Sequence, residues 1–353
     1  MLIEPRDRFV FVPLLYELMS GELKGWEVAP DYASLLQGHG ISHLQDRAGS
    51  IDLDARCVTT ASGRALQYSQ LVIATGAQPE DFGIQGVRDN ALNFHTLSDL
   101  QPLQERVQEL RRRPSGTSSL VIAGAGATGV ELACKLVDML NGAAKVQLVE
   151  LGDQILPRSK AFNREQAEKA LKKRGVTVHL NTRVESVTAT SVMLSGAQGS
   201  SQQHHDGLIW TAGSRPSIPD ISPKLELHQG RLPVTESLRL QGYPEVLALG
   251  DIAVNPDADE LSSWPHSAQT AIQQGQFAAK ELKAKLQNND VNTFVFNDLG
   301  EMLSLGIGDA SITGLGLTLA GPLAFKLRRL TYLTRLPGLS LGLRAAGAWL
   351  VSP

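Results

Sequence analysis

The sequence predicts an α/β protein with two related units built on parallel sheets and a C-terminal segment of different character. Three observations support this prediction: a glycine-rich loop near residue 124, an internal similarity between separate segments, and a change in composition after residue 298. Hydrophobic residues make up 42% and charged residues 20% of the 353 residues, as in a globular chain of about two domains. The formal net charge of −3 gives no reason to expect nucleic-acid binding.

The glycine-rich loop has the spacing GxGxxG, with Gly124, Gly126 and Gly129 at its fixed positions. A short apolar strand precedes it, a helix from about Thr128 follows it, and a second strand ends in Glu150. In this context the glycines permit a tight turn, close approach of a pyrophosphate and close packing of the helix on the strand. The helix N-terminus offers N–H groups to phosphates, and the carboxylate accepts hydrogen bonds from a ribose. The motif therefore predicts a dinucleotide-binding domain.

The acid at position 150 also bears on which dinucleotide this domain, residues 114–216, would bind. A carboxylate at the ribose repels the 2′-phosphate of NADPH and so favours NADH. Arg158 and Lys160 lie near enough in the sequence to attract that phosphate. We expect NADH as the cofactor, with NADPH as the alternative.

Two pairs of segments in the chain resemble each other. Residues 71–79 resemble residues 208–216, and residues 2–7 resemble residues 148–153. In each pair, both segments contain the end of a predicted strand and the residues that follow it. Such self-similarity indicates that one structural unit is used twice.

The repeat predicts a second nucleotide-binding domain, discontinuous over residues 1–113 and 217–298. The spacing from the glycine motif to Glu150 would place the equivalent motif of this domain ahead of Met1. We therefore expect the chain to be truncated, without the first strand, phosphate loop and first helix of this domain. That strand is central in a doubly wound sheet. The alternative is a first unit that is built differently and binds no nucleotide.

Two further features lie in the second part of this predicted domain. A strand over 243–251 brings Asp251 to its carboxyl end, where ligands of open α/β sheets gather, and the carboxylate suits a sugar hydroxyl or a flavin ribityl chain. A helix follows with Ser267 as its N-cap. Gln269 and Gln273 share one face of this helix, which suits either a solvated surface or a binding site.

The C-terminal segment, residues 299–353, has five Lys and Arg residues against two acids. A helix predicted over 322–335 mixes Leu, Phe and Tyr with four of these cations. Basic residues beside large apolar ones favour a helix that lies in a membrane interface. A helix packed on the core, or a dimer contact, is the alternative. No stretch is long and apolar enough to predict a membrane-spanning helix.

Taken together, these motifs resemble the type II NAD(P)H:quinone oxidoreductase family, flavoproteins with two Rossmann-like dinucleotide-binding domains in a glutathione-reductase-like architecture. The segment that contains Glu4 and Pro13 resembles the family's segment whose acid holds the FAD ribose. Thr75 and Gly76 resemble the crossover motif that joins the FAD and NAD domains, and Gly213 holds the same place in the related segment.

The resemblance extends to the second half of the chain. Gly250 and Asp251 match the family's second FAD motif, and Ala268 begins a helix whose N-terminus would face the flavin. Gln269 and Gln273 resemble the family's quinone-site motif, in which they would hydrogen-bond to quinone carbonyls.

Glu131 matches the acid that the family places near the nicotinamide and the flavin, with an orienting or proton-relay role. The resemblance thus implies FAD-dependent oxidation of NAD(P)H with electron transfer to a membrane quinone. The tail is similar to the cyanobacterial and plastid branch, which reduces plastoquinone, demethylphylloquinone or similar quinones. It implies a peripheral membrane protein at the cytoplasmic face of a cytoplasmic or thylakoid membrane, a lipid surface as partner, and a homodimer as one assembly.

Alternatives remain open at this stage. The chain could be a soluble flavin reductase of an iron–sulfur carrier, or an inactive fragment that binds NAD. A sulfide:quinone reductase would need redox cysteines, and neither Cys57 nor Cys134 has a visible partner. We expect no metal site, because His204 and His205 lie in a polar stretch that is expected to face solvent.

Overall fold

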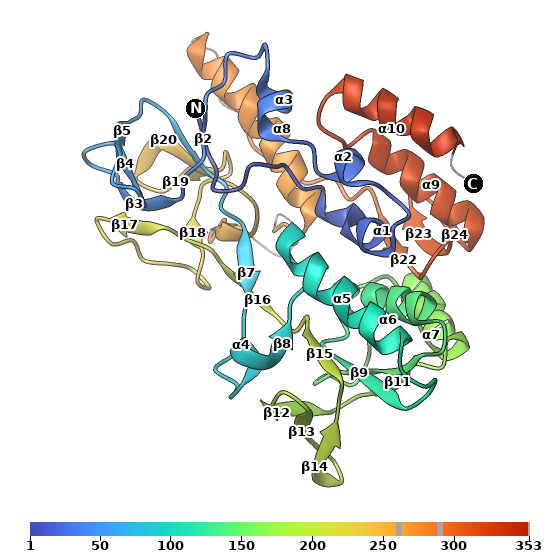
Figure 1. Ribbon diagram of the computed structural model, residues 1–353. Coiled ribbons are helices and arrows are strands. Elements are labelled where there is room, and N and C mark those ends of the chain that lie inside the picture. Colours follow the sequence, from blue (N-terminus) through green and yellow to red (C-terminus); the bar gives the residue numbers. More distant parts are fainter. Residues whose placement is uncertain (259–262, 288–291, 352–353) are drawn as a thin grey trace. The chain divides into compact units, whose positions relative to one another are not determined.

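The computed structural model describes residues 1–258, 263–287 and 292–351 (Figure 1). The chain forms two compact units. Unit 1 comprises Met1–Asp7, Gly38–Gln78 and Ser214–Asp298, and unit 2 comprises Arg8–Gln37, Pro79–Gly213 and Leu299–Pro353. Each unit is a set of residues that contact one another. The predicted domains, in contrast, were defined by the cofactor that each is expected to bind. The domain boundaries given above therefore stay predictions.

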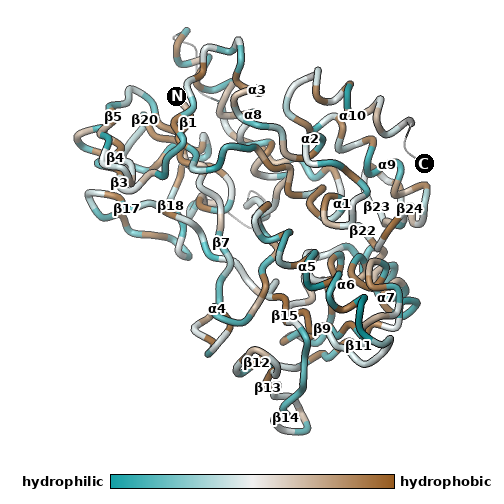
Figure 2. Tube along the Cα trace, in the orientation of Figure 1, coloured by the Kyte–Doolittle hydropathy of each residue, from teal (hydrophilic) through white to brown (hydrophobic). Residues whose placement is uncertain are grey.

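Unit 2 is built around a parallel sheet of five strands in the order β11-β10-β9-β15-β8. The strands are β8 (Ala91–Leu92), β9 (Ser118–Ala123), β10 (Ala144–Val149), β11 (Thr177–His179) and β15 (Gly207–Trp210). β9, which leads into the glycine-rich loop, is the central strand, with β10 on one side and β15 on the other. The last four residues of β9 and the last three of β15 are apolar and buried, as a parallel sheet covered on two faces requires (Figure 2).

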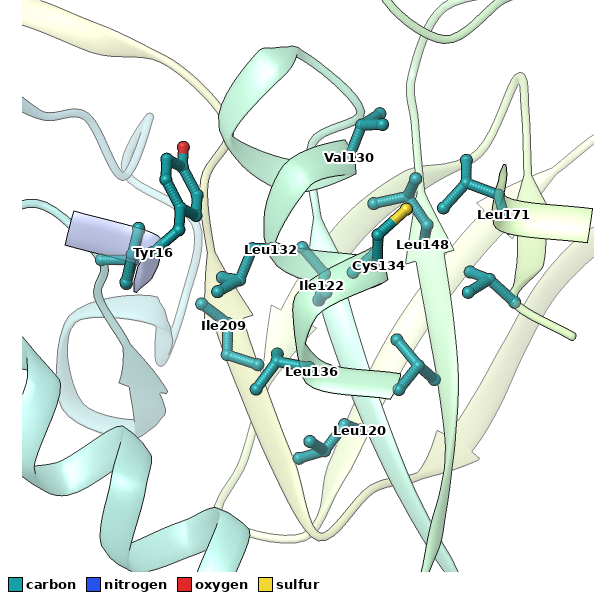
Figure 3. Packing of buried hydrophobic residues seen from close by; sticks show 14 of the residues in the cluster. Tyr16, Leu120, Ile122, Val130, Leu132, Cys134, Leu136, Leu148, Leu171 and Ile209 are labelled. Carbon is teal, nitrogen blue, oxygen red and sulfur yellow. The ribbon is translucent and has the colours of Figure 1, made fainter. Parts of the chain in front are cut away.

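Helices cover this sheet and close its core. They are α4 (Val87–Asn90), α5 (Leu100–Arg111), α6 (Ala127–Leu140) and α7 (Ala161–Lys173), with a 3-10 turn at Leu97–Asp99. The predicted helix after the glycine motif is confirmed: α6 ends at Leu140, and its C-cap Asn141 has a left-handed φ of 48°. Leu132 and Leu136 of α6 are fully buried and pack in one cluster with Ile122 and Ile209 of the sheet (Figure 3). This packing fixes the N-terminus of α6 at the carboxyl end of β9.

Unit 2 also takes in an N-terminal segment and the C-terminal segment. The first contributes α1 (Leu15–Ser20), α2 (Gly25–Val28), α3 (Tyr32–Leu36) and a 3-10 turn at Val12–Leu14. The second contributes an antiparallel sheet of β22 (Glu301–Ser304), β23 (Ala310–Gly314) and β24 (Leu317–Ala320), followed by α9 (Pro322–Leu333) and α10 (Leu339–Val351). A further antiparallel sheet is formed by β12 (Arg183–Val187), β13 (Ser191–Gly196) and β14 (Gly199–His204).

The predicted C-terminal helix is confirmed as α9. Ala324 and Phe325 pack on Ala310 of β23, so one face of α9 belongs to the core of the unit. Other side chains of α9 are exposed. Among the helices that the structure describes, none is long and apolar enough to cross a membrane.

Two of the short sheets of unit 1 contain the strands that the internal repeat relates to unit 2. In one, β1 (Leu2–Ile3) pairs with β2 (His43–Leu44), and in the other β6 (Leu71–Ile73) pairs with β20 (Tyr243–Ala248), which also pairs with β19 (Arg239–Leu240). By the internal repeat, β1 corresponds to β10 and β6 to β15, the two strands between which β9 lies in unit 2. In the described part of unit 1, no strand pairs with the second edge of β1 or of β6, so the two sheets remain separate.

The remaining elements complete unit 1. They are β3 (Ala48–Asp52), β4 (Cys57–Thr60), β5 (Ala65–Gln67), β7 (Ala77–Pro79), β16 (Ser214–Pro216), β17 (Asp220–Ser222), β18 (Leu232–Pro233), β21 (Ala253–Val254), a 3-10 turn at Gly250–Ile252 and α8 (Ala268–Leu286). Ser267 caps α8, as expected, because its hydroxyl accepts the Thr270 N–H at 3.2 Å. The buried residues of α8 are Thr270, Gln274, Ala278 and Glu281, so the buried face of this helix is largely polar.

Candidate active site

The three glycines of the motif lie at the carboxyl end of β9, and each serves a different purpose. Gly124 has a φ of 102°, and a Cβ there would stand 2.9 Å from the backbone of Ala212. A Cβ on Gly129 would stand 1.8 Å from the Gly124 carbonyl oxygen, so this glycine allows α6 to pack closely. A Cβ on Gly126 would meet nothing within 4 Å. The loop therefore leaves open space at the helix N-terminus, the place where a pyrophosphate binds in such folds.

Glu150 follows β10 directly and faces this loop. Its carboxylate accepts the Ala125 N–H at 2.6 Å and the Gly152 N–H at 2.8 Å. Two backbone donors hold the group in place, while a carboxylate has about four acceptor sites in total. The structure thus brings Glu150 next to the glycine motif. Its carboxylate can still accept further hydrogen bonds, such as those from ribose hydroxyl groups. Gly213, which follows β15, lies at the same end of the sheet.

Glu131, on the second turn of α6, is buried and surrounded by charged and phenolic side chains. Its Oε1 accepts the Ser304 N–H at 2.6 Å and lies 3.9 Å from Arg328 Nη2. The Tyr16 side chain from α1 also interacts with this carboxyl group. Four segments of unit 2 therefore meet at one carboxyl group: α1, α6, the end of β22, and α9.

Arg328 joins this cluster from α9. The side chain is 1% exposed and forms an ion pair with Glu17, which is fully buried. Its Nη2 donates to the Pro13 carbonyl oxygen at 2.8 Å, and its guanidinium lies 4.8 Å from the Tyr332 ring centroid. Arg328 is one of the four cations of the predicted interfacial helix, but it lies in the core, because buried carboxylates draw it there.

The cluster has unusual proton affinities. Burial raises the pKa of Glu131 to about 7, although the positive charge of Arg328 and the Ser304 N–H oppose this. Burial, and then the negative charge of Glu131, raise the pKa of Tyr16 well above its ordinary value. A carboxyl group with a pKa near neutrality can both take up and release a proton at physiological pH. Glu131 is thus the clearest candidate for proton handling in unit 2.

In unit 1, Glu4 lies at the end of β1, as the repeat predicts. Arg6 Nε and Nη2 donate to its carboxylate at 2.7 and 2.9 Å. Burial raises the pKa of Glu4, but the hydrogen bonds and charge of Arg6 outweigh this, and the pKa lies below its ordinary value. Glu4 is therefore an ionised acceptor at the carboxyl end of a strand, which suits a ribose hydroxyl.

Gly250 and Asp251 follow β20, at the carboxyl end of the second sheet of unit 1. The Gly250 N–H donates to Gln274 Oε1 at 2.7 Å, and Gly250 has a φ of 71°. The Gln274 side chain is 0% exposed, and within the described residues its Nε2 has no hydrogen-bond partner. Such an orphaned donor is costly and indicates that a polar partner belongs at this place. Sequence reasoning missed Gln274, because its neighbour Gln273 fits the quinone-site motif.

The predicted quinone-site residues lie on the first turns of α8, which begins at Ala268. Gln273 Nε2 donates to the Asn297 carbonyl oxygen at 2.8 Å, and Gln273 Oε1 accepts the Asn297 N–H at 3.0 Å. Gln273 Nε2 also lies 3.3 Å from Gln269 Oε1. Both polar atoms of Gln273 therefore have protein partners, so that this side chain ties α8 to the backbone at residue 297.

The crossover residues lie at the end of β6. Gly76 has a φ of 65°, and its carbonyl oxygen accepts the Ser217 N–H at 2.8 Å. Thr75 is exposed. The left-handed conformation at position 76 explains a glycine there, since a side chain would be strained.

The cysteines and histidines do not form a redox or metal centre in the described chain. Cys134 is buried, and burial raises the pKa of its thiol to about 12, which disfavours the reactive thiolate. His204 is exposed, but His205 is buried, contrary to the expectation that both face solvent. Among the residues described, no group of three or more His, Cys, Asp or Glu side chains is arranged to hold a metal.

Comparisons with known proteins agree with this arrangement. Residues 1–275 match the model of the pyridine nucleotide-disulphide oxidoreductase family. The chain is 36% identical to the demethylphylloquinone reductase of Synechocystis sp., covering 100% of this chain and 88% of that protein. It is 32% identical to the alternative NAD(P)H-ubiquinone oxidoreductase C1 of Arabidopsis thaliana, covering 95% of this chain and 72% of that protein.

A solved structure shares the fold. The model is similar to NDH2 from Plasmodium falciparum in complex with NADH, with a TM-score of 0.85 and 17% identity, over 100% of this chain and 94% of that one. At this identity the likeness concerns the fold alone. The assignment rests on the match to the family model over residues 1–275 and on the identity to relatives over 88% and 72% of their length. The chain belongs to the pyridine nucleotide-disulphide oxidoreductase family and, within it, to the type II NAD(P)H:quinone oxidoreductases.

Proposed function

We propose that this chain binds FAD, oxidises NAD(P)H and passes the electrons to a membrane quinone, as a dehydrogenase that pumps no protons. The observation that carries the proposal is the position of Glu131 on α6. The same helix presents its N-terminus to the open space at Gly126 and, on its second turn, a buried carboxyl group with a pKa of about 7. Dinucleotide binding and proton handling are thus built on one rigid element.

The dinucleotide is held by the glycine motif and by Glu150. The α6 N-terminus and the loop N–H groups bind the pyrophosphate at Gly126, while Glu150 accepts hydrogen bonds from the adenosine ribose. The fixed carboxylate makes NADH the preferred donor. NADPH is the weaker alternative, because its 2′-phosphate would meet this negative charge.

We assign the flavin mainly to residues of unit 1. Glu4, Gly250 and Asp251 would hold its ribose, phosphates and ribityl chain, and the buried Gln274 Nε2 supports a polar group at this place. The other residues assigned to it from the family resemblance are Pro13, Thr75, Gly76, Gly213 and Ala268. Bound FAD supplies the ring that accepts a hydride and passes electrons on. The N-terminus of α8 favours negative charge that develops near it.

Glu131 is proposed to move a proton during quinone reduction, which consumes two electrons and two protons. Arg328 keeps the group from being permanently protonated, because its positive charge lowers the pKa that burial raises. Gln269 and Gln273 are proposed to donate hydrogen bonds to the quinone carbonyls. For Gln273 this role requires that its Nε2 release one of its two acceptors, the Asn297 carbonyl oxygen or Gln269 Oε1.

The quinone would be reached from a lipid surface on which the protein lies peripherally. Leu323, Leu327 and Leu330 of α9 are 65%, 41% and 59% exposed, and their spacing places them on one face of the helix. Lys326 lies exposed between them. Apolar side chains beside a cation suit a helix at the interface of an anionic membrane. We propose docking at the cytoplasmic face of a cytoplasmic or thylakoid membrane.

For the quinone itself we propose demethylphylloquinone, plastoquinone or a similar lipid quinone. The relative from Synechocystis is named for demethylphylloquinone and the Arabidopsis relative for ubiquinone. A homodimer is proposed from the family resemblance alone.

The test compares electron acceptors. Purified protein, loaded with FAD, is given NADH and either a short-chain quinone or an oxidised iron–sulfur carrier, and NADH oxidation is followed by absorbance. The proposal expects turnover with the quinone and none above background with the carrier. Turnover with the carrier alone would instead support the soluble reductase. No turnover with either acceptor, in protein that binds NADH, would support an inactive NAD-binding chain.

A further inference from the structure

Phe82 is an exposed aromatic residue with a strained backbone conformation. It lies in unit 2, in the loop that follows β7, and its side chain is 63% exposed. Its φ is 52°, in the left-handed region that bulky side chains rarely adopt. A protein keeps such a conformation only where the surrounding structure enforces it, and such residues cluster at binding sites.

The loop is fixed by hydrogen bonds on both sides of Phe82. The Phe82 N–H donates to Glu80 Oε1 at 3.1 Å, and the Gly83 N–H donates to Asp81 Oδ1 at 2.9 Å. Asp81 is held in turn by Arg88, whose Nη2 lies 2.9 Å from Oδ2. These contacts involve the backbone and the acids, and they leave the aromatic ring outside. The loop therefore presents the ring and does not bury it.

The ring lies at the carboxyl end of the parallel sheet. A Cβ on Gly213 would stand 2.4 Å from Phe82 Cζ, so the glycine makes room for the ring. Gly213 follows Ala212, whose backbone in turn lies beside Gly124 of the glycine motif. Trp210 of β15 connects the loop to this end of the sheet, because its Nε1 donates to the Glu80 carbonyl oxygen at 2.8 Å.

The order of strands decides which part of a dinucleotide would meet this ring. Dinucleotides cross the carboxyl ends of such sheets at the point where the strand order reverses, which here lies between β9 and β15. Glu150 marks the adenosine side, beside β10, and Gly126 marks the pyrophosphate. The other half of the molecule then runs toward the end of β15, where Gly213 and Phe82 lie.

We propose that Phe82 forms one wall of the subsite for the nicotinamide half of the bound dinucleotide. The proposal rests on dinucleotide binding to unit 2, the first step of the proposed function. An aromatic face offers stacking to a planar ring and excludes water from it. Because hydrogen bonds already order the backbone of this loop, little conformational entropy is lost when the ligand binds against the ring.

The test uses two ligands that differ only at the end in question. NAD⁺ carries the nicotinamide, whereas ADP-ribose has the adenosine, the pyrophosphate and the second ribose without it. Calorimetric titration measures the Kd of each with no electron acceptor present. In Phe82→Asn the ring is lost, but the residue tolerates a positive φ, so that the loop is kept. We expect NAD⁺ to bind about five- to tenfold more weakly and ADP-ribose to bind within about twofold of the unaltered protein.

Two variants serve as controls. Phe82→Tyr keeps the aromatic face and should bind NAD⁺ as tightly as the unaltered protein does. Leu315, in the turn between β23 and β24, is also exposed and has a φ of 50°, so Leu315→Asn makes the same change at a position outside the sheet. It should leave both affinities unchanged.

Either of two results would overturn the proposal: NAD⁺ affinity that is unchanged in Phe82→Asn, or an equal loss for NAD⁺ and ADP-ribose, which would show a general loop effect. Because no quinone takes part, a failure of quinone reduction leaves this measurement intact. If the unaltered protein binds neither ligand, the proposed function is wrong and this proposal is wrong with it.

Discussion

Arg328 of α9 lies with its Nη2 3.9 Å from Glu131 Oε1 of α6, and both side chains are buried. The contact joins the C-terminal helix, which carries the exposed leucine face, to the helix that is proposed to bind the dinucleotide. Glu17 holds the other side of the guanidinium. The protonation of Glu131 therefore depends on a residue of the segment proposed to meet the membrane.

Replacing Glu131 should change how quinone reduction depends on pH. The carboxyl group, with a pKa of about 7, changes its protonation near neutrality. In Glu131→Gln we expect kcat with a short-chain quinone to fall by about a hundredfold, the scale of a lost general acid–base group, and any inflection near pH 7 to disappear. NAD⁺ binding should be unchanged. A pH profile that keeps its inflection in the variant would assign that inflection to another group.

The same carboxyl group should affect stability. The pKa of Glu131 is raised from 4.5 to about 7 in the folded chain, mainly by burial, so between these values the folded state holds more protons than the unfolded state. The free energy of unfolding contributed by this group is therefore highest below about pH 4.5 and falls as the pH rises to 7. In Glu131→Gln this fall should be absent. Thermal denaturation of both proteins at several pH values in this range measures the difference. If stability depends on pH in the same way in both, the buried and protonated state of Glu131 is contradicted.

Loss of the charge should destabilise the protein strongly at Arg328 and hardly at all at Lys326. Arg328→Met leaves Glu17 buried without its cation, which costs about 3–5 kcal/mol of folding free energy. Lys326→Gln, on an exposed position of the same helix, should change stability by less than about 0.5 kcal/mol. Chemical denaturation of both variants checks this. Equal stabilities would mean that Arg328 is exposed to solvent.

The exposed face of α9 should be required for binding to lipid. Changing Leu323, Leu327 and Leu330 to Ser removes apolar area from that face, and binding to anionic lipid vesicles should fall at least tenfold in cosedimentation. Reduction of a soluble short-chain quinone should persist. Leu286→Ser is the matched control, because this residue of α8 is 83% exposed. Vesicle binding that survives the triple change but fails in the control would place the lipid contact on unit 1.

Cofactor choice should depend on the charge at position 150. Glu150→Gln keeps an oxygen that can accept the Ala125 N–H but removes the repulsion of a 2′-phosphate. We expect the ratio of kcat/KM for NADH to that for NADPH to fall about tenfold, equivalent to about 1.4 kcal/mol. An unchanged ratio would show that Glu150 does not meet the ribose.

The sequence was sufficient where local signals determine the structure. The glycine spacing predicted the turn, the N-terminus of α6 and the position of Glu150, and Ser267 predicted the start of α8. Each of these features depends on residues close together in the chain.

Contacts between distant segments could not be predicted in this way. Nothing near Arg328 distinguishes it from Lys326 in the sequence, yet Glu17, Pro13 and Glu131 draw it into the core. The same holds for the pairing of Gln273 with Asn297 and for the burial of Gln274. Burial of a polar group depends on which segments pack around it, and that is decided by the tertiary fold.

The most direct test of the central claim is an absorbance spectrum of the purified protein loaded with FAD. We expect flavin bands at about 370 and 450 nm that NADH bleaches and a short-chain quinone restores. Bands that NADH leaves unchanged, or that stay bleached when the quinone is added, would contradict electron transfer from NADH to quinone by this chain.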